Sequence, residues 1–322
     1  KKKKKKRGRE WNYLFFFSSF LSHTHTLLFL FLFEITNLKI PMHPIIFAFG
    51  LSTLLVVYTR RKKSLTRDGA GGAFVLGMTT FASSYWLFTV VLLTFFLTSS
   101  KLTKFKAERK RLLEDEYDLS SERNLTQVLC NGLVGGIAVS FFHTLADSEL
   151  VCYSSFPWGK MLLWIYIGHY SCCAGDTWAS ELGILNSSWP FLITKWERVP
   201  PGTNGGVSPL GLFASLAGGL CIGLVAALSL ALDQRCHGFD WSVIILGAMA
   251  GLGGSLIDSI LGATIQETVY SKDRKMIMTD RSAIKEANID IRGWNILDNH
   301  QVNFVSSLLT SSLCGLAALY FQ

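Results

Sequence analysis

The sequence predicts an all-α integral membrane protein, a polytopic helical bundle with about six to eight transmembrane helices. Hydrophobic residues make up 49% of the 322-residue chain and charged residues only 17%, whereas a soluble domain usually carries about 25% charged residues. Several apolar runs approach the roughly 20 residues that cross a bilayer as a helix. These runs are continuously apolar rather than alternating, which argues against a β-barrel.

Seven apolar segments are candidate spans, and the second is long enough to hold two helices. At 1.5 Å per residue, a single helix over 70–99 would be about 45 Å long, whereas the hydrocarbon core is about 30 Å thick. This segment is therefore either one tilted helix or two short helices hinged near Ser83 and Ser84. The candidate spans are 43–59, 70–99, 127–146, 159–175, 210–232, 243–266 and 302–321.

Two basic loops favour the two-helix interpretation. The loop from Arg60 to Arg67 and the loop from Lys101 to Arg111 are both rich in Lys and Arg. A single span between them would place them on opposite sides of the membrane, whereas a hairpin keeps both in the cytosol, as the positive-inside rule prefers. The second cluster is most simply interpreted as a lipid-facing charge run that sets the topology.

The same rule orients the remaining loops. The 176–209 and 267–300 loops carry Lys and Arg and are predicted to be cytosolic. The 147–158 and 233–242 loops then lie on the other side. The two longest loops therefore share one membrane face, as a site built from both would require.

Charge and cysteine content argue against other functions. The net charge is +8, but the basic residues stand in short clusters beside apolar runs, where topology explains them better than nucleic-acid binding does. The seven cysteines include no CxxC pair, and Cys172-Cys173 lies in an apolar run, where cysteine behaves as a small hydrophobe. We expect neither a zinc site nor a disulfide framework.

Residues 1–41 differ in composition from the rest. They begin with Lys1–Lys6 and contain a Leu/Phe tract at Leu27–Phe33, and the first methionine is Met42. We expect this stretch to be a non-native or disordered leader, followed by a single multi-pass membrane domain over 42–322. The alternative is a signal peptide, because a basic region precedes an apolar one, although no small-residue cleavage site follows.

Two carboxylates, Asp176 and Glu181, stand at the end of the apolar run 159–175. On a helix they would be about 140° apart, so they do not share a narrow face, but both can face a site at a helix end. Metal-bound phosphates usually need only one or two carboxylates. The alternative is that Asp176 caps the start of a helix and Glu181 is solvated.

A glycine-rich loop follows about twenty residues later, at Gly202–Ser208. Its glycines allow backbone N–H groups to converge on an anion, and a helix beginning near Pro209 would add its positive dipole end. Lys195 or Arg198 would neutralise phosphate charge. The alternative is an ordinary inter-helix turn, because the loop matches neither the Walker nor the dinucleotide pattern. The candidate phosphate-binding residues here are Lys195, Arg198, Gly202, Thr203, Asn204, Gly205 and Gly206.

Asp258 lies inside the apolar run Ile244–Ile265. An acid within a membrane span is costly and indicates function by default, although a buried hydrogen-bond anchor is the alternative. Glycines in this run would let neighbouring helices approach closely. They are Gly247, Gly251, Gly254 and Gly262.

Polar residues also flank the last span. Asp298 or Asn299 is a plausible helix N-cap, whereas Asn303 lies one turn inside. By the predicted topology Asp176, Asp258 and Asp298 all fall near the cytosolic membrane face, which favours a shared site. His143 and His169 are single histidines in apolar runs, and we expect them to be packed or hydrogen-bonded rather than metal ligands.

Several long motifs resemble the transmembrane protein 19 family, also called domain of unknown function 92. The likeness covers nearly all of residues 43–321. The motifs that carry it are Leu97–Lys104, Gly175–Gly183, Gly202–Ser208, Gly254–Gln266 and Ile296–Ser311.

The resemblance implies a reaction, because the family includes a phytyl-phosphate kinase. It implies that a phosphoryl group is transferred from a nucleoside triphosphate to an isoprenoid monophosphate. CTP is the expected donor, and Mg²⁺ is the expected metal. Asp176, Glu181 and Asp258 would be catalytic, and Asp176 and Asp258 would hold the metal. Lys195, Arg198 and the Gly202–Gly206 loop would bind phosphates, and Asp298 and Asn303 would complete the site.

Two other functions stay open. One is a non-enzymatic multi-pass membrane protein of sugar-responsive growth that acts through partners, and the other is a transporter, which would show inverted repeats and helices broken near mid-membrane. Because residues 1–41 lack the composition of a transit peptide, we expect an endomembrane or plasma-membrane location rather than the chloroplast envelope.

Overall fold

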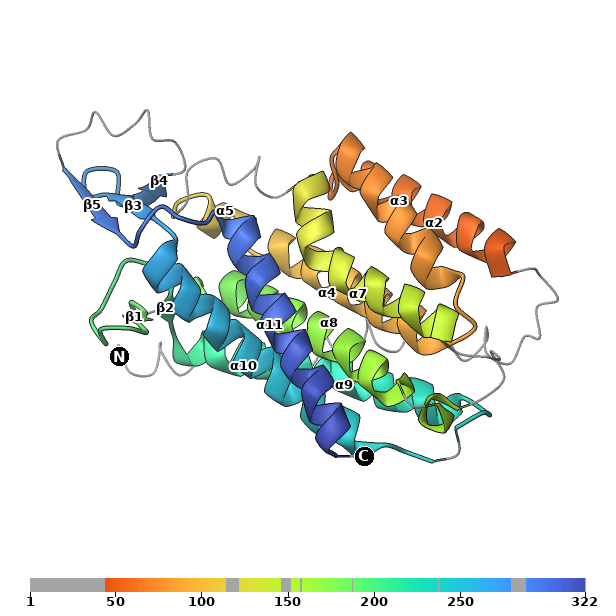
Figure 1. Cartoon of the computed structure of the whole chain (residues 1–322). Coiled ribbons are helices and arrows are strands. Elements are labelled where there is room, and N and C mark those ends of the chain that lie inside the picture. The colour runs from red at the N-terminus through yellow and green to blue at the C-terminus, as the bar shows by residue number, and fades with distance from the viewer. Residues whose placement is uncertain are drawn as a thin grey trace, which may run out of the picture. The chain divides into compact units, whose positions relative to one another are not determined.

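The computed structural model describes residues 44–113, 122–145, 152–156, 158–186, 188–236, 238–278 and 288–321. The chain divides into two units, Lys1–Met42 and His43–Gln322, and every described residue belongs to the second. The predicted leader at 1–41 lies outside the described residues. Figure 1 shows the arrangement of the helices in the second unit.

Helices dominate the described part of the chain, as predicted. Eight helices of at least 15 residues are joined by loops, a short helix α5 (Ala107–Lys110) and a 3₁₀ turn η1 (Tyr153–Ser155). The long helices are α2 (Pro44–Arg61), α3 (Arg67–Phe81), α4 (Trp86–Lys104), α7 (Leu125–Leu145), α8 (Gly159–Gly183), α9 (Pro209–Leu232), α10 (Trp241–Ile265) and α11 (Asn299–Tyr320).

Two small antiparallel sheets lie in the loops that follow α8 and α10. β1 (Phe191–Leu192) pairs with β2 (Gly206–Val207), and β3 (Thr268–Ser271) lies between β4 (Met276–Met278) and β5 (Ile289–Arg292). Figure 1 shows both sheets and α5 at one end of the helical bundle. The strands are too short to change the fold class, and they shape the loops at this end.

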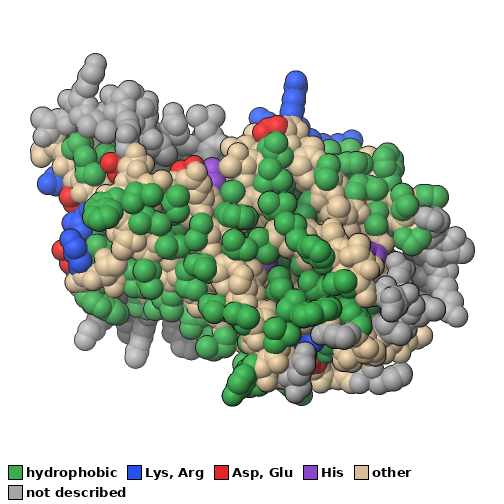
Figure 2. Space-filling model, viewed as in Figure 1, with side chains coloured by type: hydrophobic (Ala, Val, Ile, Leu, Met, Phe, Trp, Pro, Cys, Tyr) green, Lys and Arg blue, Asp and Glu red, His purple; other side chains and the backbone are tan. Residues whose placement is uncertain are grey.

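The multi-pass prediction is confirmed. Six of the described helices, α2, α4, α7, α9, α10 and α11, are long and apolar enough to cross a membrane. α8, with 25 residues, is as long as α10 but more polar, and it packs against five helices, α4, α7, α9, α10 and α11. A helix enclosed by others can carry polar side chains that a lipid-facing helix cannot. Figure 2 shows hydrophobic side chains spread over the outer face of the helices in view.

The predicted hairpin over 70–99 is confirmed. α3 ends at Phe81 and α4 begins at Trp86, and the turn between them is closed by the Tyr85 amide, which donates to Ser83 Oγ at 3.2 Å. The Lys104 ammonium donates to the Lys62 carbonyl oxygen, so the two basic loops meet at one end of the bundle. We call this the basic end, and the positive-inside rule assigns it to the cytosol.

α8 is longer than the sequence predicted. The apolar span was expected to stop at 175, with a loop from 176 onward, but the helix continues to Gly183. Trp178 and Leu182 are buried and extend the apolar face, while Glu181 pairs with a lysine. The alternative in which Asp176 caps a helix start is therefore wrong, because α8 begins at Gly159.

Glycines set the spacing of α8, α9 and α10. A Cβ atom on Gly175 would lie 2.5 Å from Gly251 O, and one on Gly219 would lie 2.1 Å from Gly247 O. Such contacts are shorter than van der Waals distances, so the backbones meet at points where only glycine fits. The close approach expected of Gly247, Gly251 and Gly254 is confirmed.

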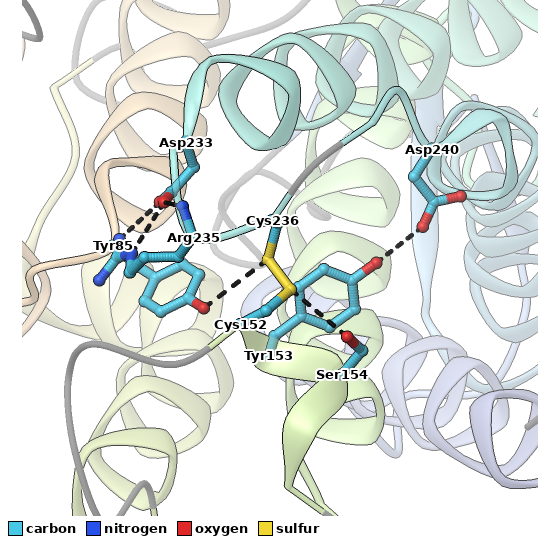
Figure 3. Close-up of a disulfide and its surroundings, with 8 residues drawn as sticks. All are labelled: Tyr85, Cys152, Tyr153, Ser154, Asp233, Arg235, Cys236 and Asp240. Carbon is cyan, nitrogen blue, oxygen red and sulfur yellow. Dashed lines mark hydrogen bonds and ion pairs between the residues drawn. A yellow bond between two sulfur atoms is a disulfide. The ribbon is translucent and has the colours of Figure 1, made fainter.

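The expectation of no disulfide was wrong. Cys152, which precedes α8, is bonded to Cys236, which follows α9, across a sequence separation of 84 residues. Sequence spacing could not reveal this pair because the two loops meet only in the folded chain. Figure 3 shows the bond and the residues around it. The order and direction of the helices place it at the end of the bundle opposite the basic end.

Polar contacts tie three loops together around the disulfide. Arg235 bonds to Asp233 at 2.5 Å and to Ser84 O at 3.1 Å, and its guanidinium lies 3.8 Å from the centre of the Tyr85 ring. Tyr153 donates to Asp240 Oδ2 at 2.9 Å (Figure 3). Burial and the neighbouring Asp240 raise the pKa of Tyr153, so it remains a donor at neutral pH. The disulfide, the ion pair and these hydrogen bonds therefore join the loops at this end of the bundle.

The glycine contacts predict a difference between two neighbouring residues of α10. A Cβ on Gly251 would lie 2.6 Å from Gly219 Cα, whereas one on Gly253 would meet nothing within 4 Å. Gly251→Ala should lower the free energy of unfolding by about 1–3 kcal/mol, and Gly253→Ala should leave it unchanged or raise it by up to about 1 kcal/mol. Thermal unfolding of the purified protein measures both, and equal effects would contradict the packing.

The disulfide predicts the sidedness of the bundle. In sealed vesicles, Cys236 of the Cys152→Ser variant should react with a membrane-impermeant maleimide only from the non-cytosolic side. A cysteine placed in the basic loop by Lys63→Cys should react only from the cytosolic side. Labelling of both positions from the same side would rule out this topology.

Candidate functional site

A cavity of about 800 Å³ lies at the basic end, among α7, α8, α9, α10 and α11. Ligand pockets commonly measure about 300–1,000 Å³. The structure brings most of the predicted site residues to its walls. Those that line it are Asp176, Glu181, Gly202, Thr203, Asn204, Gly205, Gly206, Asp258, Asp298 and Asn303.

A junction of three helices places the two intramembrane acids. A Cβ on Gly254 would lie 2.4 Å from Cys172 Sγ and 3.0 Å from Thr310 Oγ1, so α8, α10 and α11 meet there. One helical turn toward the cavity from this junction, the same faces carry Asp176, Asp258 and Ser306. The two carboxylates therefore reach the cavity wall at one level.

Asp258 is held by α11. Ser306 Oγ donates to Asp258 Oδ2 at 2.9 Å. The Asn303 amide, oriented with its nitrogen toward Asp258, donates to the same oxygen at 3.2 Å and to Asn299 O at 3.0 Å. These bonds fix the direction of the carboxylate, and Asp258 and Asn303 both face the cavity. Asn303 therefore both lines the cavity and donates a hydrogen bond to Asp258.

Asp176 lies close enough to Asp258 for their charges to repel. Two desolvated carboxylates in one place are costly unless a cation compensates them. No group of three or more His, Cys, Asp or Glu side chains that could hold a metal occurs among the described residues. Two carboxylates suit Mg²⁺, which keeps several waters and shares its remaining positions with phosphate oxygens.

The glycine-rich loop is fixed against α10. Gly205 has φ +74°, and a Cβ there would lie 2.5 Å from Ser259 O, so both its conformation and its contacts require glycine. Asn204 Nδ2 donates to Glu267 O at 3.0 Å. The predicted helix start is confirmed, since α9 begins at Pro209 with Ser208 as its N-cap.

Three amides of this loop are already bonded within the protein. The N–H groups of Thr203, Asn204 and Gly206 donate to Pro200 O, Thr268 Oγ1 and Thr203 O, respectively, at 3.2, 3.1 and 3.0 Å. They therefore do not form the anion cradle that the glycines suggested. The loop contributes a rigid wall beside the N-terminus of α9, whose dipole is positive at this end.

Lys195 and Arg198 are not brought to the cavity. Both are exposed in the loop around β1, and the Arg198 guanidinium lies 4.9 Å from the centre of the Phe191 ring. Asp298 does line the cavity, and it also caps α11 by accepting from His300 N at 2.8 Å and Gln301 N at 2.9 Å. The capping role considered for Asp298 is therefore present. The phosphate-binding role given to Lys195, Arg198 and Asp298 stays a prediction.

The structure adds a buried lysine that sequence reasoning missed. Lys110 was assigned to a topogenic charge run, but it is 1% exposed and lines the cavity. Its ammonium pairs with Glu181 and donates to Leu102 O at 2.9 Å and Thr103 O at 3.1 Å. Nothing local in the sequence separates Lys110 from the neighbouring Arg109 and Arg111. Only the fold of α4 and α5 brings it to Glu181.

Arg123 was also missed, because it stands alone just before α7. Its side chain lines the cavity and lies over the rings of Phe95 and Phe96, 5.8 and 5.9 Å from their centres. Burial lowers the pKa of Arg123 and the charge of Glu181 opposes this change, but a guanidinium remains charged in proteins. His169, by contrast, is buried with Nε2 3.0 Å from Asn131 O, as expected of a hydrogen-bonded histidine.

The Lys110–Glu181 pair predicts a large stability effect. Lys110→Met leaves Glu181 without its paired lysine and takes one donor from each of two carbonyl groups, so it should cost about 2–4 kcal/mol. Exposed Lys272, in the β3–β4 turn, supplies the control, and Lys272→Met should change stability by less than about 0.5 kcal/mol. The double variant Lys110→Met/Glu181→Leu should recover part of the loss in thermal unfolding. Equal effects of Lys110→Met and Lys272→Met would show that the pair contributes little.

Comparisons with known proteins agree with this architecture. The sequence pattern of the family described as Integral membrane protein DUF92 matches residues 50–311. Protein PGR of Arabidopsis thaliana is 41% identical over 287 residues, which are 87% of this chain and 98% of that protein. No solved structure matches the chain significantly.

Prokaryotic relatives are more distant. An uncharacterised membrane protein of Synechocystis is 30% identical over 205 residues, covering 64% of this chain and 73% of its own. One of Methanocaldococcus jannaschii is 27% identical over 213 residues, covering 66% and 79%. Because the family pattern matches well over half of the chain and Protein PGR is 41% identical over 87% of it, the chain belongs to the integral membrane protein family DUF92.

Proposed function

We propose that this protein is a membrane-embedded isoprenoid phosphate kinase. It transfers the terminal phosphoryl group of a nucleoside triphosphate to an isoprenoid monophosphate such as phytyl or farnesyl phosphate. CTP is the nucleotide that we expect as donor. The observation that carries the proposal is the pair of intramembrane acids, Asp176 and Asp258, which face one polar cavity at the basic end of the bundle.

The location of the cavity suits both substrates. It lies where helix ends meet the loops, so a nucleotide can enter from the cytosol while an acceptor keeps its hydrocarbon chain in the bilayer. Its volume of about 800 Å³ is large enough for a nucleotide and a phosphate head group. A soluble acceptor would not require acids at this depth.

The donor set fits the implied metal. Asp176 and Asp258 offer carboxylate oxygens, and no cysteine of the described residues lines the cavity, which suits Mg²⁺. These two acids would hold the ion. When bound, it would neutralise charge on the transferred phosphoryl group.

The rest of the reaction needs positioning more than proton transfer. An oxygen of the acceptor phosphate forms a bond to the terminal phosphorus, and the bond from that phosphorus to the bridging oxygen breaks. The products are a nucleoside diphosphate and an isoprenoid diphosphate. A phosphate monoester has a second pKa of about 6 and is mostly a dianion at pH 7, so no strong base is needed. Orientation and charge neutralisation dominate such transfers.

Individual residues then have separate tasks. Ser306 and Asn303 orient Asp258. Glu181 pairs with Lys110 and holds this lysine at the cavity wall. Lys195 and Arg198, which lie outside the cavity wall, should contribute less than the sequence suggested.

The disulfide supports an endomembrane or plasma-membrane location. Structural disulfides persist where one side of the membrane is oxidising, as in the secretory pathway and at the cell surface. Cys152–Cys236 lies at the end opposite the cavity. The cavity would then open to the reducing cytosol, where nucleoside triphosphates are available.

The transporter alternative has less support. It predicts helices broken near mid-membrane at the binding site, whereas α8, α9, α10 and α11 each run as one helix of 22–25 residues. A non-enzymatic role leaves the paired acids without a task. Flux of a substrate into proteoliposomes without nucleotide would favour transport.

A kinase assay tests the proposal. Purified protein in lipid nanodiscs should convert farnesyl or phytyl phosphate to the diphosphate with CTP and Mg²⁺, and chelation should stop the reaction. Asp176→Asn and Asp258→Asn should each lower kcat at least about 100-fold. Asp273→Asn, an exposed acid in the β3–β4 turn outside the cavity, is the matched control. Full activity in both cavity variants would refute this site assignment. The absence of transfer with any nucleotide would refute the proposed kinase activity.

A further inference from the structure

We propose that Arg123 is the side chain that recognises phosphate in the cavity. This inference deepens the proposed function and rests on it for the identity of the ligand as a phosphate ester. It replaces Lys195 and Arg198 by a cation from a different part of the chain.

The backbone of Arg123 is held on both sides. Its amide donates to Ser64 O at 3.0 Å, and its carbonyl oxygen accepts from the Thr66 amide at 3.0 Å. A Cβ on Gly69 would lie 2.4 Å from that same carbonyl oxygen, so α3 begins in direct contact with this residue. The loop between α2 and α3 thus fixes where the side chain of Arg123 starts.

Aromatic rings hold the guanidinium without using its hydrogen bonds. Phe95 and Phe96 of α4 lie 5.8 and 5.9 Å away, within the range of cation–π attraction. Among the described residues, no group accepts a hydrogen bond from the guanidinium, although Glu181 attracts it electrostatically. Its planar fork of N–H donors matches two oxygens of a phosphate.

Lys110, the other strong cation on the cavity wall, is already occupied. An ammonium has three donors, and those of Lys110 go to Leu102 O, Thr103 O and Glu181. Glu181, in turn, is paired with Lys110. Arg123 is therefore the cation suited to an incoming anion.

The charge pattern of the cavity supports this assignment. Asp176 and Asp258 would repel a phosphate and accept a metal, so an anion needs a positive group elsewhere on the wall. Arg123 enters from the α7 side, whereas Asp258 enters from α10. A phosphate between them would meet a metal on one side and a guanidinium on the other. Both the nucleotide and the isoprenoid phosphate offer this chemistry.

Binding measurements on the full chain test the inference and separate the two sources. CTP and farnesyl phosphate are titrated one at a time, so that no turnover occurs, with cytidine and farnesol as uncharged counterparts. Arg123→Gln should weaken binding of at least one phosphate ligand about 10- to 100-fold and leave binding of the uncharged counterparts unchanged. The ligand that is weakened identifies the source.

Two further variants sharpen the result. Arg198→Gln removes a cation of the same membrane face that lies outside the cavity, and it should weaken phosphate binding by less than about threefold. Arg123→Lys keeps the charge but loses the fork, so it should still weaken binding at least about fivefold. If Arg123→Gln does not fold, as judged by thermal unfolding, Arg123→Lys carries the test.

The outcomes distinguish this inference from the proposed function. Binding of either phosphate ligand that depends on Arg123, with no phosphoryl transfer, would support the inference and refute the kinase. Phosphoryl transfer with unchanged KM and unchanged binding in Arg123→Gln would support the kinase and refute the inference. Failure of the wild-type protein to bind either ligand, or equal losses in Arg123→Gln and Arg198→Gln, would also refute the inference.

Discussion

The backbone contacts between α8, α9 and α10 are the constraint on which the rest of the structure depends. Helices in lipid have no hydrophobic driving force for association, so close packing must provide the attraction. Gly175, Gly219 and Gly251 bring the three helices within a distance that any side chain would prevent. Gly254 extends this packing to α11. The two intramembrane acids reach one cavity because Gly254, one turn from Asp258, leaves room for Cys172, one turn from Asp176.

The two ends of the bundle handle polar groups differently. At the end that carries the disulfide, the Arg235 contacts and the Tyr153–Asp240 bond satisfy polar groups within the protein. At the basic end, Lys110 is fully bonded, but the acids of α8 and α10 and the guanidinium of Arg123 face a polar cavity. Buried charge of both signs is costly unless it is compensated. A cavity lined by charges of both signs is suited to a ligand that brings its own metal and phosphate.

Much of the fold follows from the sequence, because apolar length and loop charge act locally. Helix positions, the hairpin at Ser83 and the start of α9 all agree with the prediction. The end of α8 was missed, since a polar segment enclosed by other helices looks like a loop in a hydropathy pattern. The disulfide was missed because its cysteines are 84 residues apart. Asp258 was recognisable from the cost of an acid in an apolar run, whereas Arg123 stands beside no motif and gains its place only from the α2–α3 loop.

The same distinction explains why the expected basic residues and the observed ones differ. Lys195 and Arg198 are near the glycine-rich loop in sequence, but β1 and β2 turn that stretch outward and leave both side chains exposed. Lys110 and Arg123 are distant from the loop in sequence, yet the α3–α4 hairpin returns the chain to the cavity and the α2–α3 loop clamps the start of α7. The first helices therefore do more than anchor the protein. They bring positive charge to the cavity whose acids the last four helices supply, so the cavity is built from both halves of the chain.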